Sequence, residues 1–318
     1  MAKTRSLRRR IRSIESTRQV TRTMEMVSTS KLKRAQGRVV GARPYARALA
    51  EVIGELLSPD LADRFPLLRQ PAPPSKGGPK SAAVLLITSN RGLAGAFNAN
   101  LIRAARDRVG ELEAAGYVVD LLVVGKKAIS YFKFMRRPLA LARLDIGDRP
   151  TAEHAAELVQ PLVARFEAGE LASLDVVFAQ FKSALATPPA VLRVLPVQPA
   201  GTDAPTHGHT EDAGHGGTGA QGHGATAPKA PVSNYILKPG ADELVGALLP
   251  LYVRNLVFRA LVETAAAEHG ARRTAMKSAT DNAGEILDVL RRTYNRARQG
   301  QITQELAEIV GGAEALKG

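Results

Sequence analysis

The chain has 318 residues, a formal net charge of +14, 4% aromatic residues, and neither cysteine nor tryptophan. The lack of cysteine excludes disulfides, thiolate nucleophiles and cysteine-based zinc sites, and no continuous apolar run approaches the length of a membrane-spanning helix. The positive charge predicts acidic partners, which are nucleic acid, anionic membrane or acidic protein surfaces.

The first predicted element is a very long helix over residues 1–57. Apolar and small side chains recur there every three or four residues, which is the spacing of a coiled-coil seam. The seam positions are Leu7, Ile11, Ile14, Leu32, Ala35, Val39 and Ala42, with a polar middle at Arg18, Thr21, Glu25 and Ser28. Residues 1–40 hold twelve Lys/Arg against two Glu. We interpret the arginine-rich start as the first turns of this helix and not as an organelle transit peptide.

Residues 58–80 are rich in Pro and Gly and are interpreted as a linker. Residues 81–200 then predict a Rossmann-like α/β domain. Apolar runs of strand length alternate with helical stretches, as in a parallel sheet covered on both faces. The strands are predicted at 82–89, 118–125, 174–181 and 190–197, and the helices near 98–115, 126–134 and 152–168.

The turn after the first of these strands, residues 90–97, carries Gly92 and Gly95 at a helix start, which is a weak signal for an anion site. It lacks the third glycine of a dinucleotide fingerprint, and the chain contains no P-loop, HExxH or GxSxG motif. A structural turn is therefore the favoured interpretation. We predict no catalytic residue and no cofactor. His154 and His269 stand singly in helical stretches, where a surface or packing role is expected.

Residues 201–232 are rich in His and Gly and too poor in apolar side chains to pack a core, so we predict a disordered insert. A transition-metal site is the alternative that this segment raises. Its candidate ligands are His207, His209 and His215. A passive insert is the favoured interpretation.

Residues 233–318 are predicted to form a second long helix, whose apolar stretch 244–262 should break or kink at Pro250. A seam follows, again with steps of three and four. Its positions are Met276, Ala279, Ala283, Ile286, Leu290, Thr293 and Ala297. Beyond it, Ile302, Leu306 and Ile309 form a new apolar face, and an exposed apolar tip of this kind needs a socket. The predicted fold class is α/β plus long α, an antiparallel coiled coil of the N- and C-terminal helices with a central Rossmann-like α/β domain.

Several segments resemble the gamma subunit of F-type ATP synthase. The longest are TRQVTRTMEMVSTSKLKRAQ (17–36), TAMKSATDNAGEI (274–286) and YNRARQGQITQELAEIVGGA (294–313). ITSNRGLAGAFNANL (87–101) and VFAQFKSAL (177–185) resemble the same family, so the similarity covers nearly the whole chain.

The resemblance implies a non-catalytic, single-copy central shaft that turns inside a hexameric ring of alpha and beta subunits. Such a shaft couples transmembrane proton flow to ATP synthesis or hydrolysis. The resemblance also implies contact of the α/β domain with the epsilon subunit and the membrane c-ring. With no obvious presequence, we expect a peripheral membrane protein on the cytoplasmic face of the bacterial inner membrane, which binds no nucleic acid.

Matching the family's motifs residue by residue gives six candidate partner contacts. They are Met24, Lys33, Arg298, Gln299, Thr303 and Glu305. Met24 matches the point where the shaft passes the beta subunits, although a purely structural role in the coiled coil is an equal alternative. The basic face around Lys33 suits acidic loops of those subunits. Residues 302–316 match the end that sits in the bearing at the top of the ring.

Two positions depart from the family's pattern. Asn90 stands where the family usually carries aspartate, and Gly300 loosens the helix beside Arg298.

Two other functional classes are alternatives to this interpretation. They are a basic coiled-coil nucleic-acid-binding protein and a small-molecule enzyme built on the α/β unit. The absence of aromatic residues interleaved with the basic ones, and the apolar C-terminal tip, weigh against nucleic-acid binding.

Overall fold

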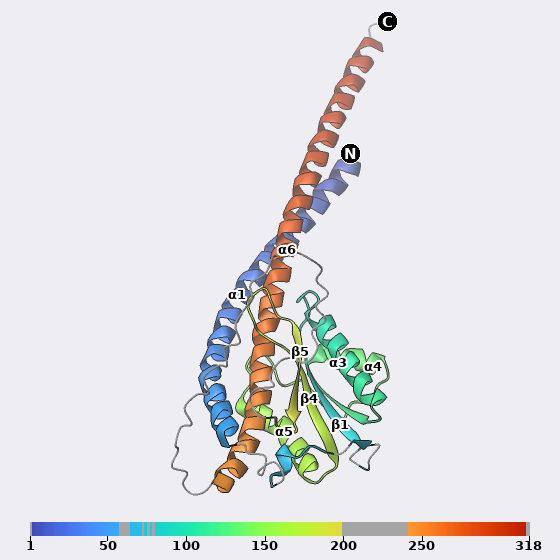
Figure 1. Ribbon diagram of the computed structural model, residues 1–318. Helices are drawn as coiled ribbons and strands as arrows, with labels where there is room; N and C mark the ends of the chain where they lie inside the picture. Colours follow the sequence, from blue (N-terminus) through green and yellow to red (C-terminus); the bar gives the residue numbers. More distant parts are fainter. Residues whose placement is uncertain are drawn as a thin grey trace, which may run out of the picture. The chain divides into compact units, whose positions relative to one another are not determined.

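The computed structural model describes residues 2–56, 64–71, 73–74, 77, 80–198 and 241–315. The chain divides into two compact units, described separately here. Unit 1 comprises residues 1–34, 93–95 and 269–318, and unit 2 comprises residues 35–92 and 96–268. Two long helices, α1 (Ala2–Leu56) and α6 (Ala241–Ala315), contribute to both units (Figure 1). The insert at 201–232, with its three candidate metal ligands His207, His209 and His215, lies outside the described residues.

In unit 1, α1 and α6 pair in antiparallel directions. Three contacts between the helices set the register: Thr4 Oγ1 to Gln301 Oε1 at 3.0 Å, Arg291 Nη2 to Glu15 Oε1 at 2.6 Å, and Thr21 Oγ1 to Thr280 Oγ1 at 2.8 Å. Residue numbers rise along α1 as they fall along α6. The predicted antiparallel coiled coil is therefore confirmed.

The predicted seam of α1 agrees with the burial pattern along this helix. Ser28 and Leu32 are buried, and Leu7, Ile11, Ile14, Thr21 and Glu25 are half-buried. Arg18 is exposed, because its long side chain reaches over the partner helix and places its guanidinium near Gly284. Arginine can follow an apolar surface in this way while its charge stays in water.

The predicted seam of α6 is correct at five of its seven positions and wrong at Ile286 and Thr293. Met276 and Ala283 are buried, and Ala279, Leu290 and Ala297 are half-buried, whereas Ile286 is 50% exposed and Thr293 is exposed. The helix turns inward Thr280 and Leu287, which are buried, and Tyr294, which is half-buried. The predicted and observed seams share Met276, Ala283, Leu290 and Ala297. They differ between these positions, where the observed seam places the larger side chain of Tyr294 inward in place of Thr293.

Unit 2 is built on a five-stranded sheet in the order β3-β2-β1-β4-β5. The strands are β1 (Ser81–Ile87), β2 (Val118–Val124), β3 (Leu141–Arg143), β4 (Leu171–Ala179) and β5 (Pro189–Leu195). All pairings are parallel except that of β4 with β5. The Rossmann-like domain is confirmed, but its last strand is antiparallel and β3 was not predicted, because three partly exposed residues carry little apolar signal.

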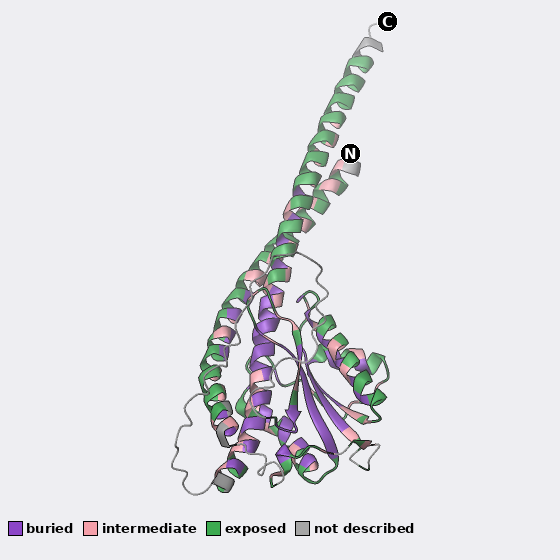
Figure 2. Cartoon of the chain, in the orientation of Figure 1, coloured by how far each residue is buried: buried purple, intermediate pink, exposed green. Residues whose placement is uncertain are grey.

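Helices cover both faces of this sheet. α3 (Phe97–Ala114) and α4 (Lys126–Phe134) lie on one face, and α5 (Ala152–Glu167) and the first part of α6 lie on the other (Figures 1 and 2). The short 3-10 helix η1 (Pro66–Leu68), within the predicted linker, buries two leucines in the same core as α5 and α6. The double cover explains why β4 is buried along its whole length.

The break expected at Pro250 is absent, because α6 continues through this residue. Its neighbours Leu249 and Val253 are 1% and 0% exposed. A proline inside a helix removes one backbone hydrogen bond, and the burial of these flanking side chains offsets that loss.

By length and composition, α6 is the one described helix that could cross a membrane. Half of its most apolar window is buried inside the fold, as in the core helix of a globular protein. The feature is therefore weak evidence for a membrane span. A search for continuous apolar runs overlooks it, because single polar residues interrupt the stretch.

Candidate functional site

All six predicted partner contacts lie in unit 1. On α6, Arg298, Gln299, Thr303 and Glu305 are exposed. At about 100° per residue, Arg298 and Glu305 lie one above the other, and Gln299 and Thr303 form an adjoining row. These four side chains therefore share a broad exposed face that spans about 160° of the helix, with Arg298 and Glu305 at its border with the α1 seam.

The polar groups on this face are held by bonds within the helix. Gln301 Nε2 donates to Glu305 Oε1 at 2.9 Å, and Thr303 Oγ1 donates to the carbonyl of Gln299 at 3.0 Å. Gly300 lies between Gln299 and Thr303, with nothing within 4 Å of the position of a Cβ. The bond from Thr303 to Gln299 therefore spans this glycine, whereas the bond from Gln301 to Glu305 lies beyond it.

An apolar face begins on the same side of α6. Ile302, Leu306, Ile309 and Val310 are 48%, 58%, 67% and 63% exposed. Because Thr4 lies opposite Gln301 and α1 begins at Ala2, the remainder of α6 continues past the start of its partner. The tip of α6 is thus a single helix with an uncovered apolar face.

Met24 and Lys33 lie elsewhere on the same unit. Met24 is twenty residues along α1 from Thr4, hence about 30 Å from the level of Gln301. Met24 is half-buried and Lys33 is exposed. The six residues therefore form two separate groups, and the half-burial of Met24 is compatible with both of its proposed roles.

Three exposed threonines of α1 bond to their own helix. Thr17, Thr23 and Thr29 donate to the backbone carbonyls of Ser13, Val20 and Glu25 at 2.8–3.0 Å. Thr293 does the same on α6, with the carbonyl of Val289 at 2.9 Å. These threonines keep their donors on the backbone of the helix that carries them.

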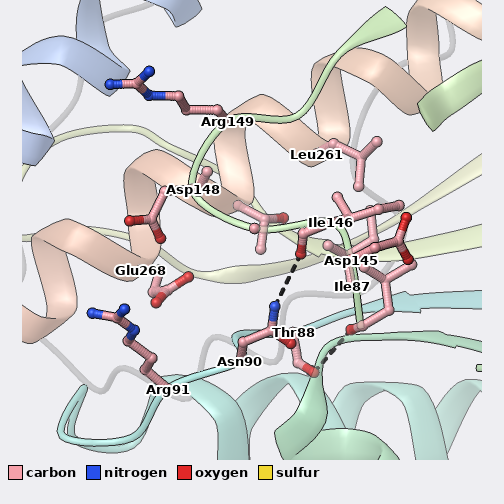
Figure 3. A pocket seen from close by; sticks show the side chains of 14 residues that line it. Ile87, Thr88, Asn90, Arg91, Asp145, Ile146, Asp148, Arg149, Leu261 and Glu268 are labelled. Atoms are coloured by element: carbon pink, nitrogen blue, oxygen red, sulfur yellow. Dashed lines mark hydrogen bonds between the residues drawn. The ribbon is translucent and has the colours of Figure 1, made fainter. Parts of the chain in front are cut away.

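In unit 2 a cavity of about 520 Å³ opens at the carboxyl ends of β1 and β2 (Figure 3). Its polar lining mixes both charges: Arg91 and Arg149 stand beside Asp145, Asp148 and Glu268. Among the described residues, no buried side-chain polar atom lacks a partner, and no group of His, Cys, Asp and Glu is arranged to hold a metal. The cavity has neither the uniform charge of a phosphate site nor a nucleophile beside a base.

One carboxylate of this cavity is strongly perturbed. Arg143 binds Asp145 through Nε at 2.8 Å and Nη2 at 2.6 Å, and these hydrogen bonds lower the pKa of Asp145 to about 2. The same guanidinium also contacts Glu157 at 2.7 Å. Asp145 is therefore an ion-pair partner that stays charged at neutral pH, and not an acid or base poised for proton transfer.

The glycine-bearing turn after β1 has a structural role. Asn90 Oδ1 accepts from the backbone N–H of Lys126 at 2.9 Å. Asn90 Nδ2 donates to the carbonyl of Leu144 at 3.0 Å and to that of Ile146 at 3.2 Å, and Figure 3 shows the bond to Ile146. One amide thus ties three segments together. Of the two lone histidines, His154 completes the cap of α5, since its Nδ1 accepts from the backbone N–H of Thr151 at 3.2 Å.

Two buried residues of α6, Glu263 and Thr264, were missed by the sequence analysis. Their signal was the presence of two adjacent polar side chains in the run from Leu256 to Ala267, which is otherwise apolar except for Arg259. They lie on the sheet side of the helix and bond to the end of β4.

Comparison with known proteins gives one consistent result. Residues 3–316 match the ATP synthase family. The ATP synthase gamma chain of Gemmatimonas aurantiaca is 54% identical over 318 residues, which cover all of both chains, and that of Moorella thermoacetica is 40% identical over 319 residues with the same coverage.

Solved structures agree in fold. A chain of the Euglena gracilis mitochondrial ATP synthase OSCP/F1/c-ring structure has a TM-score of 0.63 at 20% identity, covering 99% of this chain and 95% of that one. A chain of the Tetrahymena thermophila ATP synthase central stalk and c-ring structure has a TM-score of 0.51 at 18% identity, covering 82% and 99%. None of these matches supports the nucleic-acid alternative. From its full-length similarity to their sequences, the chain belongs to the ATP synthase family, among the gamma chains.

Proposed function

We propose that this chain is the central shaft of an ATP synthase, turning inside a ring of alpha and beta subunits to couple transmembrane proton flow to ATP synthesis or hydrolysis. The observation that carries the proposal is the antiparallel α1–α6 pair, from which α6 continues as a single helix with an apolar face. A paired coiled coil supplies stiffness along the axis, and the uncovered apolar end fits a socket in a partner.

The partners are proposed from the chemistry of the surface together with the family. Acidic loops of the beta subunits suit the exposed basic residues of α1, which include Arg22, Lys33 and Arg34. Arg298, Gln299, Thr303 and Glu305 contact the ring, and the tip from Ile302 onward occupies its bearing. The epsilon subunit and the membrane c-ring bind the α/β domain. One chain serves each complex.

The chain itself is proposed to carry no catalytic site, because the mixed charges of its cavity and the ion-paired Asp145 offer no acid, base or nucleophile in position. ATP chemistry would then take place on the partner subunits. The complex is proposed to be a peripheral assembly on the cytoplasmic face of a bacterial inner membrane.

Reconstitution tests this function. The purified chain is mixed with its cognate alpha and beta subunits, and the mass of the complex and its ATP hydrolysis are measured. We expect one copy per three alpha–beta pairs and sustained turnover only when the chain is present. A folded chain that fails to assemble, or a ring that turns over equally well without it, would refute the proposal.

A matched pair of variants tests the contact face. Arg298→Ala should lower ATP hydrolysis in the assembled complex, because it removes a cation from the proposed contact face. Arg296→Ala removes another exposed cation, about 160° round the same helix from Arg298, and should change hydrolysis less. Equal effects of the two changes would remove Arg298 from the proposed contact.

A further inference from the structure

The end of β4 has two backbone donors for which the sheet provides no acceptor. In a strand, successive N–H groups point to opposite sides, and Gln180 donates toward β5, to the carbonyl of Pro188 at 3.0 Å. The N–H groups of Ala179 and Phe181 therefore point to the other side, toward β1. The pairing of β1 with β4 ends at Leu86 and Val177, so β1 does not extend far enough to accept them.

Two side chains of α6 accept these bonds. Thr264 Oγ1 accepts from the N–H of Ala179 at 3.2 Å while donating to the carbonyl of Ala260 at 2.7 Å. Glu263 Oε2 accepts from the N–H of Phe181 at 3.1 Å, and its Oε1 accepts from Arg259 Nε at 2.8 Å. Glu263 and Thr264 are 2% and 3% exposed. A buried carboxylate and a buried hydroxyl thus extend the hydrogen bonding of the sheet beyond the end of β1.

The position of these bonds within the sheet is informative. β1 and β4 are neighbours whose connections lead to opposite sides of the sheet, so the gap at their carboxyl ends is a topological switch point. Open α/β sheets bind their ligands in this gap. Here Glu263 and Thr264 accept hydrogen bonds from the backbone N–H groups of Phe181 and Ala179 at this gap. Figure 2 shows that the adjoining part of α6 is buried. The helix stands where a ligand binds in related architectures.

We propose that Glu263 and Thr264 are a latch that fixes α6 to the sheet and through which turning force passes between the α/β domain and the shaft. The inference rests on the proposed rotor function. The hydrophobic effect that holds α6 against the sheet has no direction. Hydrogen bonds from one helix to the backbone of a central strand do have direction, and α6 is continuous from the latch to Ala315.

The torsional stiffness of single assembled complexes tests the latch. The chain has no cysteine, so Ser130→Cys on the exposed side of α4 gives a unique site for attaching a bead. With the alpha–beta ring fixed and the rotor paused, the width of the bead's angular fluctuations reports the stiffness between ring and sheet. Thr264→Val and Glu263→Gln should each widen the fluctuations, while Thr264→Ser, which keeps the hydroxyl, should preserve the original width.

Controls separate stiffness from fold stability. Thr293→Val and Glu285→Gln make the same chemical changes at exposed positions of α6, and neither should widen the fluctuations. A loss of fold stability alone would reduce the number of complexes and leave the fluctuation width of each unchanged. If Thr264→Val fails to assemble, Glu263→Gln decides by the same comparison.

The outcomes distinguish the two proposals. Unchanged width in both latch variants, or equal widening in the controls, would overturn the latch while complexes of the original chain still rotate. Failure of the original chain to rotate in the ring would instead overturn the rotor function. Widening in Thr264→Val and Glu263→Gln that is absent in Thr264→Ser, Thr293→Val and Glu285→Gln supports the latch.

Discussion

The hydroxyls of Thr21 and Thr280 lie 2.8 Å apart across the α1–α6 pair. Each is also within hydrogen-bond distance of a carbonyl of its own helix, Arg18 at 3.0 Å and Met276 at 2.8 Å. Thr280 is 9% exposed, so this is a polar contact inside the seam. Polar residues at seam positions fix the register of coiled coils at some cost in stability.

From this contact we expect the free-energy costs of substitutions at Thr21 and Thr280 to be non-additive. Thr280→Val should cost about 0.5–1.5 kcal/mol, since it leaves the Thr21 hydroxyl facing a methyl group. Adding Thr21→Val should cost less than the sum of the two single changes, because the seam then packs two apolar side chains. Urea unfolding of the full chain with both single variants and the double variant measures the coupling. Strictly additive free energies would contradict the contact.

Gly125 predicts a large loss of stability on a minimal change. Its φ is 104°, and an added Cβ would lie 2.2 Å from the carbonyl oxygen of Thr88. Gly125→Ala should destabilise unit 2 by more than about 2 kcal/mol, as measured by urea unfolding. Gly110→Ala is the matched control, because nothing lies within 4 Å of its Cβ position inside α3. It should stabilise the chain by about 0.5–1 kcal/mol.

Asp175 joins α3 to the sheet through two arginines. We expect the loss of the arginines to cost more stability than the loss of the charge on Asp175. Its carboxylate, 1% exposed, binds Arg108 Nε at 2.9 Å and Arg193 Nε at 3.1 Å. Burial lowers the pKa of Arg108, but the attraction and hydrogen bonds of Asp175 and Glu111 together outweigh it, so the pKa is raised overall.

Replacing both arginines by Met should cost about 3–5 kcal/mol, because the buried carboxylate loses its partners. Asp175→Asn should cost less, since Arg193 is 38% exposed and can turn to water. Urea midpoints of the two variants test this order, and the reverse order would contradict it.

Asp145 predicts a dependence of stability on pH. Hydrogen bonds from Arg143 lower its pKa from 3.8 to about 2, so folding favours the charged carboxylate. Its contribution is fully present above pH 4 and is lost as the pH falls toward 2. Because Asp145 is 51% exposed, we expect less than about 1 kcal/mol at pH 7.

The comparison of Asp145→Asn with the original chain measures this term. Their free energies of unfolding should differ at pH 7 and converge between pH 4 and pH 2. Asp107→Asn, at an exposed position of α3, serves as the control and should show a smaller pH-dependent difference. A gap that widens in acid would contradict the ion pair.

The sequence predicted what local pattern determines and missed what depends on distant segments. β1, β2 and β4 were found because continuous apolar runs follow from burial on both faces. β3 was missed because only three residues pair at the sheet edge. The role of Glu263 and Thr264 depends on where β1 ends relative to β4, and no pattern within one helix contains that information.

The outward threonines of the shaft have a consequence for friction. Thr17, Thr23 and Thr29 each donate their hydroxyl hydrogen to a backbone carbonyl of α1. A surface that surrounds the helix therefore contacts their methyl groups and hydroxyls whose hydrogens are already hydrogen-bonded. Each step of rotation past such a surface breaks few directional bonds. The drag then depends mainly on screened charges, which vary smoothly with angle. Threonine slightly weakens a helix, but at these outward positions it lowers the resistance of the helix to rotation.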